Sequence, residues 1–249
     1  MQPSAYTSAV HAGARRHDDG EGRPSAEVVH DVHDRYLVEI VEELGLCPFA
    51  RRSRELGRVH RPLWWTDGGH PSARACAGRL AALARDFADA EIVLLTFVVP
   101  AGDPWQDAET FAAFVPELRA AYDSLGGPRF FMVAFHPGFP AHASASARPE
   151  SLVPAIRRSP DPVIQCVHAE VLERARAQAQ LTARERLRER FAHDPVMAAL
   201  IEKSVQADPE LSAEIARNNF AAVGTGPGRD ELERRIADIA RDRGVRYAG

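Results

Sequence analysis

The stretch Glu91-Ile92-Val93-Leu94-Leu95-Thr96-Phe97-Val98-Val99, which Pro100 ends, decides the fold. It is an almost unbroken run of apolar and β-branched residues, which is typical of a strand buried on both faces. Residues 108–125 then have a helical pattern closed by two glycines, and residues 129–135 form a second apolar run. A strand, a helix and a strand with a crossover of this length predict a right-handed unit with parallel strands.

The segments on either side extend this pattern. Apolar residues recur every three or four positions through residues 26–44, which predicts an amphipathic helix with Ser25 as its N-cap and Gly45 at its end. A short strand is expected within residues 59–65 and a helix over residues 72–88. After residue 150 we expect only helices, including one over residues 162–180.

The fold class that follows is α/β, with α+β as the alternative. We expect a small, mostly parallel sheet of three or four strands, flanked by helices, and an all-helical C-terminal region. The chain has 249 residues, of which 45% are hydrophobic and 27% are charged, so a sizeable core is expected. The expected organisation is a disordered N-terminal tail over residues 1–24, an α/β core domain over residues 25–180, and a helical extension over residues 181–249 packed on the core.

Composition also restricts the compartment and the partners. A net charge of -4 gives no general basic field, so we expect no nucleic-acid partner. The three cysteines are widely spaced without a CxxC pair, which favours a reducing compartment. Residues 1–24 hold no apolar signal-peptide core, and no apolar run approaches the roughly 20 residues of a membrane span. The prediction is a soluble cytoplasmic protein without a membrane partner, whose oligomeric state stays open.

Cys47 is the first candidate for chemistry. Gly45 and Pro48 hold it in a fixed turn, and Arg51 is among the arginines that follow. A nearby guanidinium favours the thiolate, which is the reactive and metal-binding form of cysteine. The alternative is a small buried residue that caps the first helix. A Cys-Pro pair also occurs where a thiolate binds haem iron, so Cys47 is a candidate haem ligand as well.

His136 is the second candidate because it directly follows the strand over residues 129–135. Ligands of open α/β sheets gather at the carboxyl ends of strands. A histidine pinned there by Pro137 is well placed for proton transfer near neutral pH. The alternative is a structural histidine that donates to a backbone carbonyl in the turn.

The third candidate is the pair Arg157 and Arg158, which a proline-rich segment follows. One of them is suited to bind a carboxylate or phosphate as a fork. The alternative is an exposed basic pair that ends a helix. Three further residues, each on a predicted helix, complete the candidate substrate-binding set: Gln165, His168 and Asn219.

Three spaced motifs are Leu46-Cys47-Pro48-Phe49-Ala50, Phe135-His136-Pro137 and Arg158-Ser159-Pro160-Asp161-Pro162. In this order they resemble the bacterial family catalogued as domain of unknown function 1415, over about residues 27 to 180. The resemblance implies that Cys47, His136 and Arg158 are functional. It also implies that Gln165 stands where many relatives carry histidine, and Asp161 where they carry an aromatic residue. The family implies no particular reaction.

The resulting hypothesis is an enzyme that acts on a small anionic metabolite. Cys47 would be the nucleophile or redox thiol, His136 the general base or acid, and Arg158, with Arg51, the anion clamp. A second hypothesis is a haem or transition-metal enzyme with Cys47 or His136 as a ligand. A third is a non-catalytic binding or adaptor protein that contacts a partner protein through its Arg-rich helical tail.

Overall fold

The structure, a computed structural model, describes residues 23–141, 152–191, 193–194 and 211–248. The predicted N-terminal tail therefore lies outside the described residues, apart from residues 23 and 24. The described strands are β1 (Val59–His60), β2 (Leu63–Trp65), β3 (Ile92–Val98), β4 (Phe130–Phe135) and β5 (Val163–His168). The first helices are α1 (Ala26–Arg35), the π-helix η2 (Tyr36–Glu42), α2 (Ala50–Glu55), α3 (Ala73–Asp86), the 3-10 helix η3 (Pro104–Gln106) and α4 (Ala108–Asp123). Those that follow are α5 (Val153–Ile156), α6 (Ala169–Arg190), α8 (Leu211–Val223) and α9 (Gly226–Tyr247).

β3 is the central strand, and all seven of its residues are buried, as its apolar run predicted. Its neighbours on one side are β1 and β2, both parallel to it, and on the other side β5, which is antiparallel. β4 pairs with β5 in the antiparallel sense. The class is α/β as expected, but the expectation of a mostly parallel sheet of three or four strands is wrong, because the described sheet has five strands and is mixed.

The difference arises from residues 162–180, which were expected to form one helix. They form β5 followed by the start of α6. Val163 to Val167 are mostly apolar and β-branched, and this strand fills the gap between β3 and β4 by pairing with both. Backbone pairing on two sides overrides the local signal of Pro162 as a helix start. β3 and β4 still run in the same direction, since each is antiparallel to β5.

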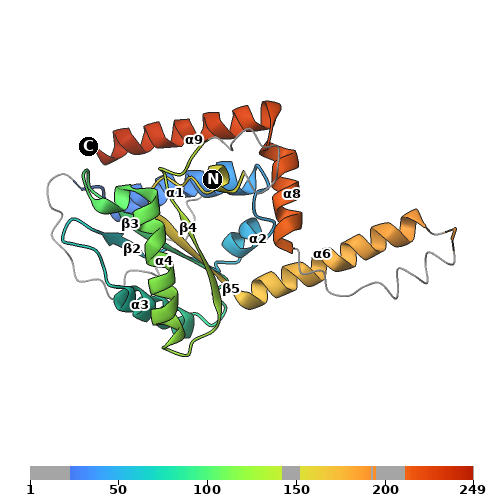
Figure 1. The fold of residues 1–249 in the computed structure, drawn as a ribbon, viewed down its shortest axis with the longest axis horizontal. Helices are drawn as coiled ribbons and strands as arrows, with labels where there is room; N and C mark the ends of the chain where they lie inside the picture. The colour runs from blue at the N-terminus through green and yellow to red at the C-terminus, as the bar shows by residue number, and fades with distance from the viewer. Residues whose placement is uncertain (1–22, 142–151, 192, 195–210, 249) are drawn as a thin grey trace, which may run out of the picture.

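Helices cover both faces of the sheet (Figure 1). α3 and α4 pack on one face, where Leu80 and Leu118 join Phe97 of β3 in the main apolar core. On the other face, Leu37 of η2 and Phe49 pack against a cluster that includes Ile92 and Leu94 of β3 and Val163 of β5. The predicted helix over residues 26–44 is present with Ser25 as its N-cap, but its second half is a π-helix.

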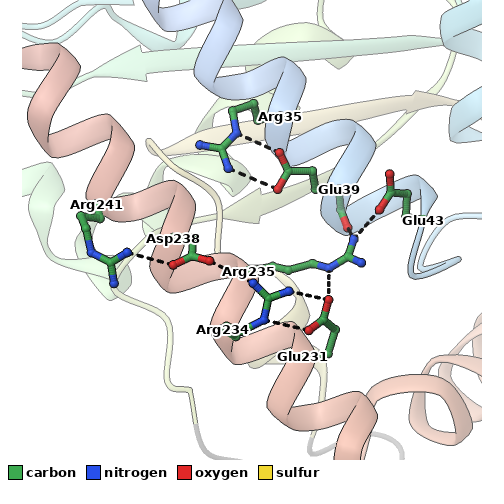
Figure 2. Close-up of polar contacts among 8 residues, drawn as sticks. All are labelled: Arg35, Glu39, Glu43, Glu231, Arg234, Arg235, Asp238 and Arg241. Atoms are coloured by element: carbon green, nitrogen blue, oxygen red, sulfur yellow. Dashed lines mark hydrogen bonds and ion pairs between the residues drawn. The ribbon is translucent and has the colours of Figure 1, made fainter.

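α9 lies along α1 and η2. Leu232 and Ile239 of α9 are buried in an apolar cluster with Ile40 of η2. Figure 2 shows Arg235 of α9 between Glu231 of its own helix and Glu43, which follows η2; the guanidinium lies 2.6 Å from Glu231 and 2.5 Å from Glu43. Within the part of the chain that the structure describes, no helix has both the length and the apolar character needed to cross a membrane.

Candidate functional site at the carboxyl edge of the sheet

The carboxyl ends of β2, β3 and β4 meet at one edge of the sheet because the three strands share a direction. Thr66 follows β2, Asp103 lies in the loop after β3, and His136 follows β4. This is the edge at which open α/β sheets bind ligands. It therefore brings together polar residues from three loops that are far apart in sequence.

His136 is 1% exposed, and both of its ring nitrogens are engaged. Nε2 donates to the carbonyl oxygen of Trp105 at 2.9 Å, and Nδ1 accepts from the backbone N–H of Gly138 at 2.9 Å. A Cβ atom at Gly138 would lie 3.0 Å from Nδ1, so this close approach favours glycine. Burial lowers the pKa of His136, which keeps the ring neutral at pH 7. In this state His136 positions the loop after β3.

Asp103 accepts three hydrogen bonds, and its side chain is only 8% exposed. The donors are the backbone N–H of Trp105 at 2.7 Å, the Thr66 hydroxyl at 3.1 Å and Nε2 of His70 at 2.7 Å. Burial by itself would raise the pKa of Asp103, but these hydrogen bonds outweigh it and hold the pKa below its usual value. The Asp103 carboxylate is therefore an anchored anion that orients His70.

His70 keeps one ring nitrogen that can accept a proton from a ligand. Its ring stacks on the indole of Trp105, with centroids 4.1 Å apart and planes 6° apart. Its side chain is 30% exposed. Because Nε2 donates to Asp103, the neutral ring has its lone pair on Nδ1, which makes no hydrogen bond to a described residue. An imidazole oriented by a carboxylate, with its other nitrogen open, is the arrangement of a general base.

The pair formed by His70 and Asp103 was not predicted from the sequence. The available signal was the rule that also identified His136, namely that ligands bind at the carboxyl ends of strands. The loops after β2 and β3 begin at that same edge. Asp103-Pro104-Trp105 also has the pattern of an aspartate that caps a short helix. His70 follows a turn of two glycines, and nothing local indicated which acidic residue it would meet.

Arg157 lies beside the same edge, because its carbonyl oxygen accepts the backbone N–H of His136 at 2.9 Å. Its side chain is half-buried, and burial lowers the pKa of the guanidinium. No carboxylate of the described residues pairs with it. An unpaired, partly desolvated guanidinium is a natural partner for an anionic group of a ligand.

No hydrogen bond joins Cys47 to His136, whose two ring nitrogens bind Trp105 and Gly138. Cys47 precedes α2, and the backbone N–H of Ala50, the first residue of that helix, donates to the carbonyl oxygen of Cys47 at 3.4 Å. Burial raises the pKa of the thiol to about 11, and the charge of Glu42 adds to this shift. Arg51, expected to favour the thiolate, instead lies 3.5 Å from Glu42. At neutral pH Cys47 is therefore a protonated thiol.

The side chains of Arg158 and Asn219 bind α5, α9 and the turn that holds Cys47. Arg158 donates to the carbonyl oxygen of Ala155 at 3.3 Å and to the carboxylate of Glu233 on α9. Asn219 is 4% exposed and donates to the carbonyl oxygen of Leu46 at 3.2 Å, one residue before Cys47. The structure thus joins Asn219 to the Cys47 turn, whereas Arg158 is bound to α5 and α9.

Gln165 and His168 are both in β5. Gln165 is half-buried at mid-strand and makes no side-chain hydrogen bond to a described residue. His168 pairs with Phe130 at the start of β4, whereas His136 follows the end of β4. Five residue steps at about 3.3 Å separate the two ends, or roughly 17 Å. One small substrate therefore cannot contact both His136 and His168.

For metal binding, no group of three or more His, Cys, Asp or Glu side chains within the described ranges could hold an ion. A haem needs only one or two axial ligands. Both nitrogens of His136 are engaged, so Cys47 is the better candidate ligand of the two. Comparison with protein-family models, with curated proteins and with solved structures gives no match. The resemblance of the three motifs to domain of unknown function 1415 therefore stays a prediction.

Proposed function

We propose that the protein is an enzyme that acts on a small anionic metabolite by general acid–base catalysis at the carboxyl edge of the sheet. One observation carries the proposal: Asp103 accepts three hydrogen bonds and orients His70, whose Nδ1 makes no hydrogen bond to a described residue. The indole of Trp105 stacks on one face of the His70 ring. His136 in turn fixes Trp105 by donating a hydrogen bond to its backbone carbonyl oxygen. Asp103 and Trp105 therefore orient the His70 ring, and its Nδ1 atom remains open to a substrate.

In the proposed mechanism, Nδ1 of neutral His70 accepts a proton from the substrate or from a water molecule that attacks it. The resulting imidazolium is stabilised by the Asp103 carboxylate, which keeps its Nε2 hydrogen bond. The same imidazolium then returns the proton to the leaving group or to the adjacent carbon. His136 is a positioning residue, because its own nitrogens hold the loops on both sides.

Arg157 supplies the recognition of the anion. Its backbone and that of Trp105 both bind His136, so Arg157 and the stacked His70 belong to neighbouring loops of one edge. The Arg157 guanidinium pairs with no carboxylate of the described residues. Replacing Arg157 with Gln should raise KM about tenfold or more and change kcat much less, because the contact is made to substrate and transition state alike. Steady-state kinetics on the best substrate measure both constants. A loss confined to kcat would contradict an anchoring role.

A reaction in which Cys47 is the nucleophile has less support than one in which His70 is the general base. A nucleophilic cysteine needs a base within hydrogen-bond reach or a lowered pKa. Among the described residues no base forms a hydrogen bond with the Cys47 thiol, and burial raises its pKa to about 11. A metal ion or haem iron would displace the thiol proton, so an absorption spectrum and metal analysis of the purified protein check that alternative directly.

The test of the proposal is a reaction screen with matched histidine variants. The panel holds activated carboxylic esters, phosphate monoesters, and 2-oxo acids whose carbon-bound protons are followed by exchange in deuterium oxide. His70→Gln should lower kcat/KM by about 10² to 10⁴ for whichever member reacts. His193→Gln, at an exposed histidine beyond the end of α6, should leave the rate unchanged. Turnover that survives His70→Gln rejects the assignment.

A further inference from the structure

β4 forms an open edge of the sheet, because β5 is its only neighbour among the described strands. The backbone N–H of Ala169 donates to the carbonyl oxygen of Arg129 at 2.8 Å. In an antiparallel ladder every second residue bonds to the same neighbour, so the residues of β4 alternate from this point. Phe130, Met132 and Ala134 therefore direct their backbone N–H and C=O groups away from β5.

Two contacts of described residues agree with this alternation and bound the open stretch. Arg119 of α4 donates to the carbonyl oxygen of Met132 at 3.2 Å, and the backbone N–H of His136 donates to Arg157 at 2.9 Å. A carbonyl oxygen can accept two hydrogen bonds, so that of Met132 keeps room for a second donor. The Arg157 backbone covers the end of the edge, and residues 130–134 form the open part.

No residue of β4 protects this edge against pairing with another chain. Natural proteins protect exposed edges with charged side chains, proline, bulges or very short strands. On the opposite side of the sheet β1 and β2 are only two and three residues long, and Arg61 and Pro62 separate them. β4 is six residues long, and all six are apolar. An edge of this kind is a template for an added strand.

The side chains of β4 also favour an added strand. Phe131 is 41% exposed and is the only exposed Phe, Tyr or Trp in the part of the chain that the structure describes. Val133 lies two residues further along the same face and is half-buried. An apolar pair therefore lies directly beside the open backbone groups.

We propose that β4 pairs in the antiparallel sense with β4 of a second copy of this chain, across a two-fold axis at Met132. This register joins residues 130–134 of the two copies through about six backbone hydrogen bonds. It places Phe131 of each copy opposite Val133 of the other, and an aromatic residue opposite a β-branched one is a favourable cross-strand pair. The edge is thus complementary to itself, as a two-fold interface requires.

The distribution of charge is compatible with a second copy in this orientation. β4 carries no charged residue, so no like charges meet along the paired stretch. Arg129 directly precedes β4, and antiparallel pairing places it opposite Phe135 of the second copy. The two Arg129 residues are then six residue steps apart, or roughly 20 Å, which exceeds the Debye length of about 8 Å. Parallel pairing would place them side by side.

The size of the interface sets the expected strength of the dimer. A standard interface buries about 800 Å² per partner, which is more than a five-residue strand pair covers by itself. We therefore expect a reversible dimer with a dissociation constant in the micromolar range. Pairing uses up the unprotected edge of both copies, so the assembly closes at two chains. Neither His70 nor Asp103 takes part, so the dimer is independent of the proposed function.

The first measurement is sedimentation velocity of the full chain, from low micromolar to several hundred micromolar concentration. The wild type should shift from the mass of one chain to that of two. Phe131→Lys places a charge on the edge and should raise the dissociation constant at least tenfold. Leu56→Lys is the matched control, because Leu56 is 49% exposed and follows α2 rather than lying in a strand. It should dimerise as the wild type does.

Amide hydrogen exchange, resolved by residue with NMR, locates the interface. The amides of Met132 and Ala134 point to the open edge, so they should exchange at least severalfold more slowly at high protein concentration than at low. The amide of Val133 faces β5 and should be protected at both concentrations. This contrast between neighbouring residues distinguishes edge pairing from dimerisation through another surface.

A wild type that stays monomeric over the whole concentration range would overturn the proposal. An unchanged dissociation constant in Phe131→Lys, or equal exchange of the Met132 amide at both concentrations, would do the same. Growth beyond two chains would also contradict it, because two-fold pairing leaves no unprotected edge. Should Phe131→Lys fail to fold, the exchange measurement on the wild type decides alone.

Discussion

Asp161 joins two helices, α1 and α9, through one fully buried carboxylate. It accepts from His33 of α1 at 3.0 Å, from Arg243 of α9 at 2.6 and 3.0 Å, and from the Tyr247 hydroxyl at 2.6 Å. Burial alone would raise the pKa of Asp161, but the hydrogen bonds and charges of His33 and Arg243 outweigh it and lower the pKa. The carboxylate therefore fixes the end of α9 to α1.

Replacing Asp161 with Asn should lower the free energy of unfolding by about 3 to 5 kcal/mol at pH 7, because His33 and Arg243 lose a buried partner. The folded-state pKa of Asp161 is depressed, so its contribution is complete above the ordinary pKa of about 4 and is lost as the pH falls through the lower folded value. Urea unfolding at pH 7 and at pH 3 measures both effects.

Asp238→Asn is the control for that experiment, because within the described ranges Asp238 pairs only with exposed arginines of its own helix. Such pairs contribute about 0 to 1 kcal/mol. If Asp161→Asn loses no more stability than Asp238→Asn, or keeps the full acid-dependent loss of the wild type, Asp161 does not fix α9.

Cys47 should react slowly with iodoacetamide in the folded protein. With a pKa of about 11, its thiolate fraction at pH 7 is on the order of a hundredfold below that of an ordinary cysteine thiol. The alkylation rate should rise steadily with pH above neutrality, as read by mass spectrometry of the peptide that contains Cys47. A rate at pH 7 equal to that of a free thiol would restore the thiolate hypothesis.

At this scale the sequence indicated which residues are unusual but not the hydrogen bonds that they make. Cys47 and His136 were correctly recognised as held by tight turns, because glycine and proline neighbours are visible in the sequence. The pKa of Cys47 depends on burial and on Glu42, and the two partners of His136 come from the backbone. The Gly138 contact is local in sequence, whereas the Trp105 contact and the burial of Cys47 depend on the folded chain.

At the scale of elements, periodicity identified β3, β4 and the helices α1, α3 and α4, because each buries a regular apolar pattern. It failed for β5, whose short apolar segment does not distinguish a strand from a buried helix. It also gave no indication that the first helix becomes π-helical at Tyr36. The strand conformation of β5 follows from its pairing with β3 and β4, which are distant in sequence.

α9 offers a matched pair of substitutions that tests its docking. Leu232 is 0% exposed in the cluster with Ile40, whereas Val245 of the same helix is 71% exposed. Leu232→Ala should lower the free energy of unfolding by about 2 to 5 kcal/mol, and Val245→Ala by less than about 0.5 kcal/mol. Thermal or urea unfolding gives both values. Equal effects would mean that α9 is not packed as described.

At the scale of the whole molecule, the topology separates two edges of the sheet. One edge collects the loops after β2, β3 and β4, with Asp103, His70 and His136. The other edge holds His168, whose backbone N–H donates to the carbonyl oxygen of Glu91. The sequence correctly predicted the shared direction of β3 and β4. The contact between His70 and Asp103 could not be predicted from the sequence, because it depends on the parallel pairing of β2 with β3.

The most direct test of the central claim is nitrogen NMR of the His70 imidazole in the wild type and in Asp103→Asn. We expect the neutral ring of the wild type to carry its proton on Nε2 and a basic lone pair on Nδ1, and Asp103→Asn to weaken this preference. A wild-type ring protonated on Nδ1, or one whose tautomers do not respond to Asp103→Asn, would contradict a general base at this edge.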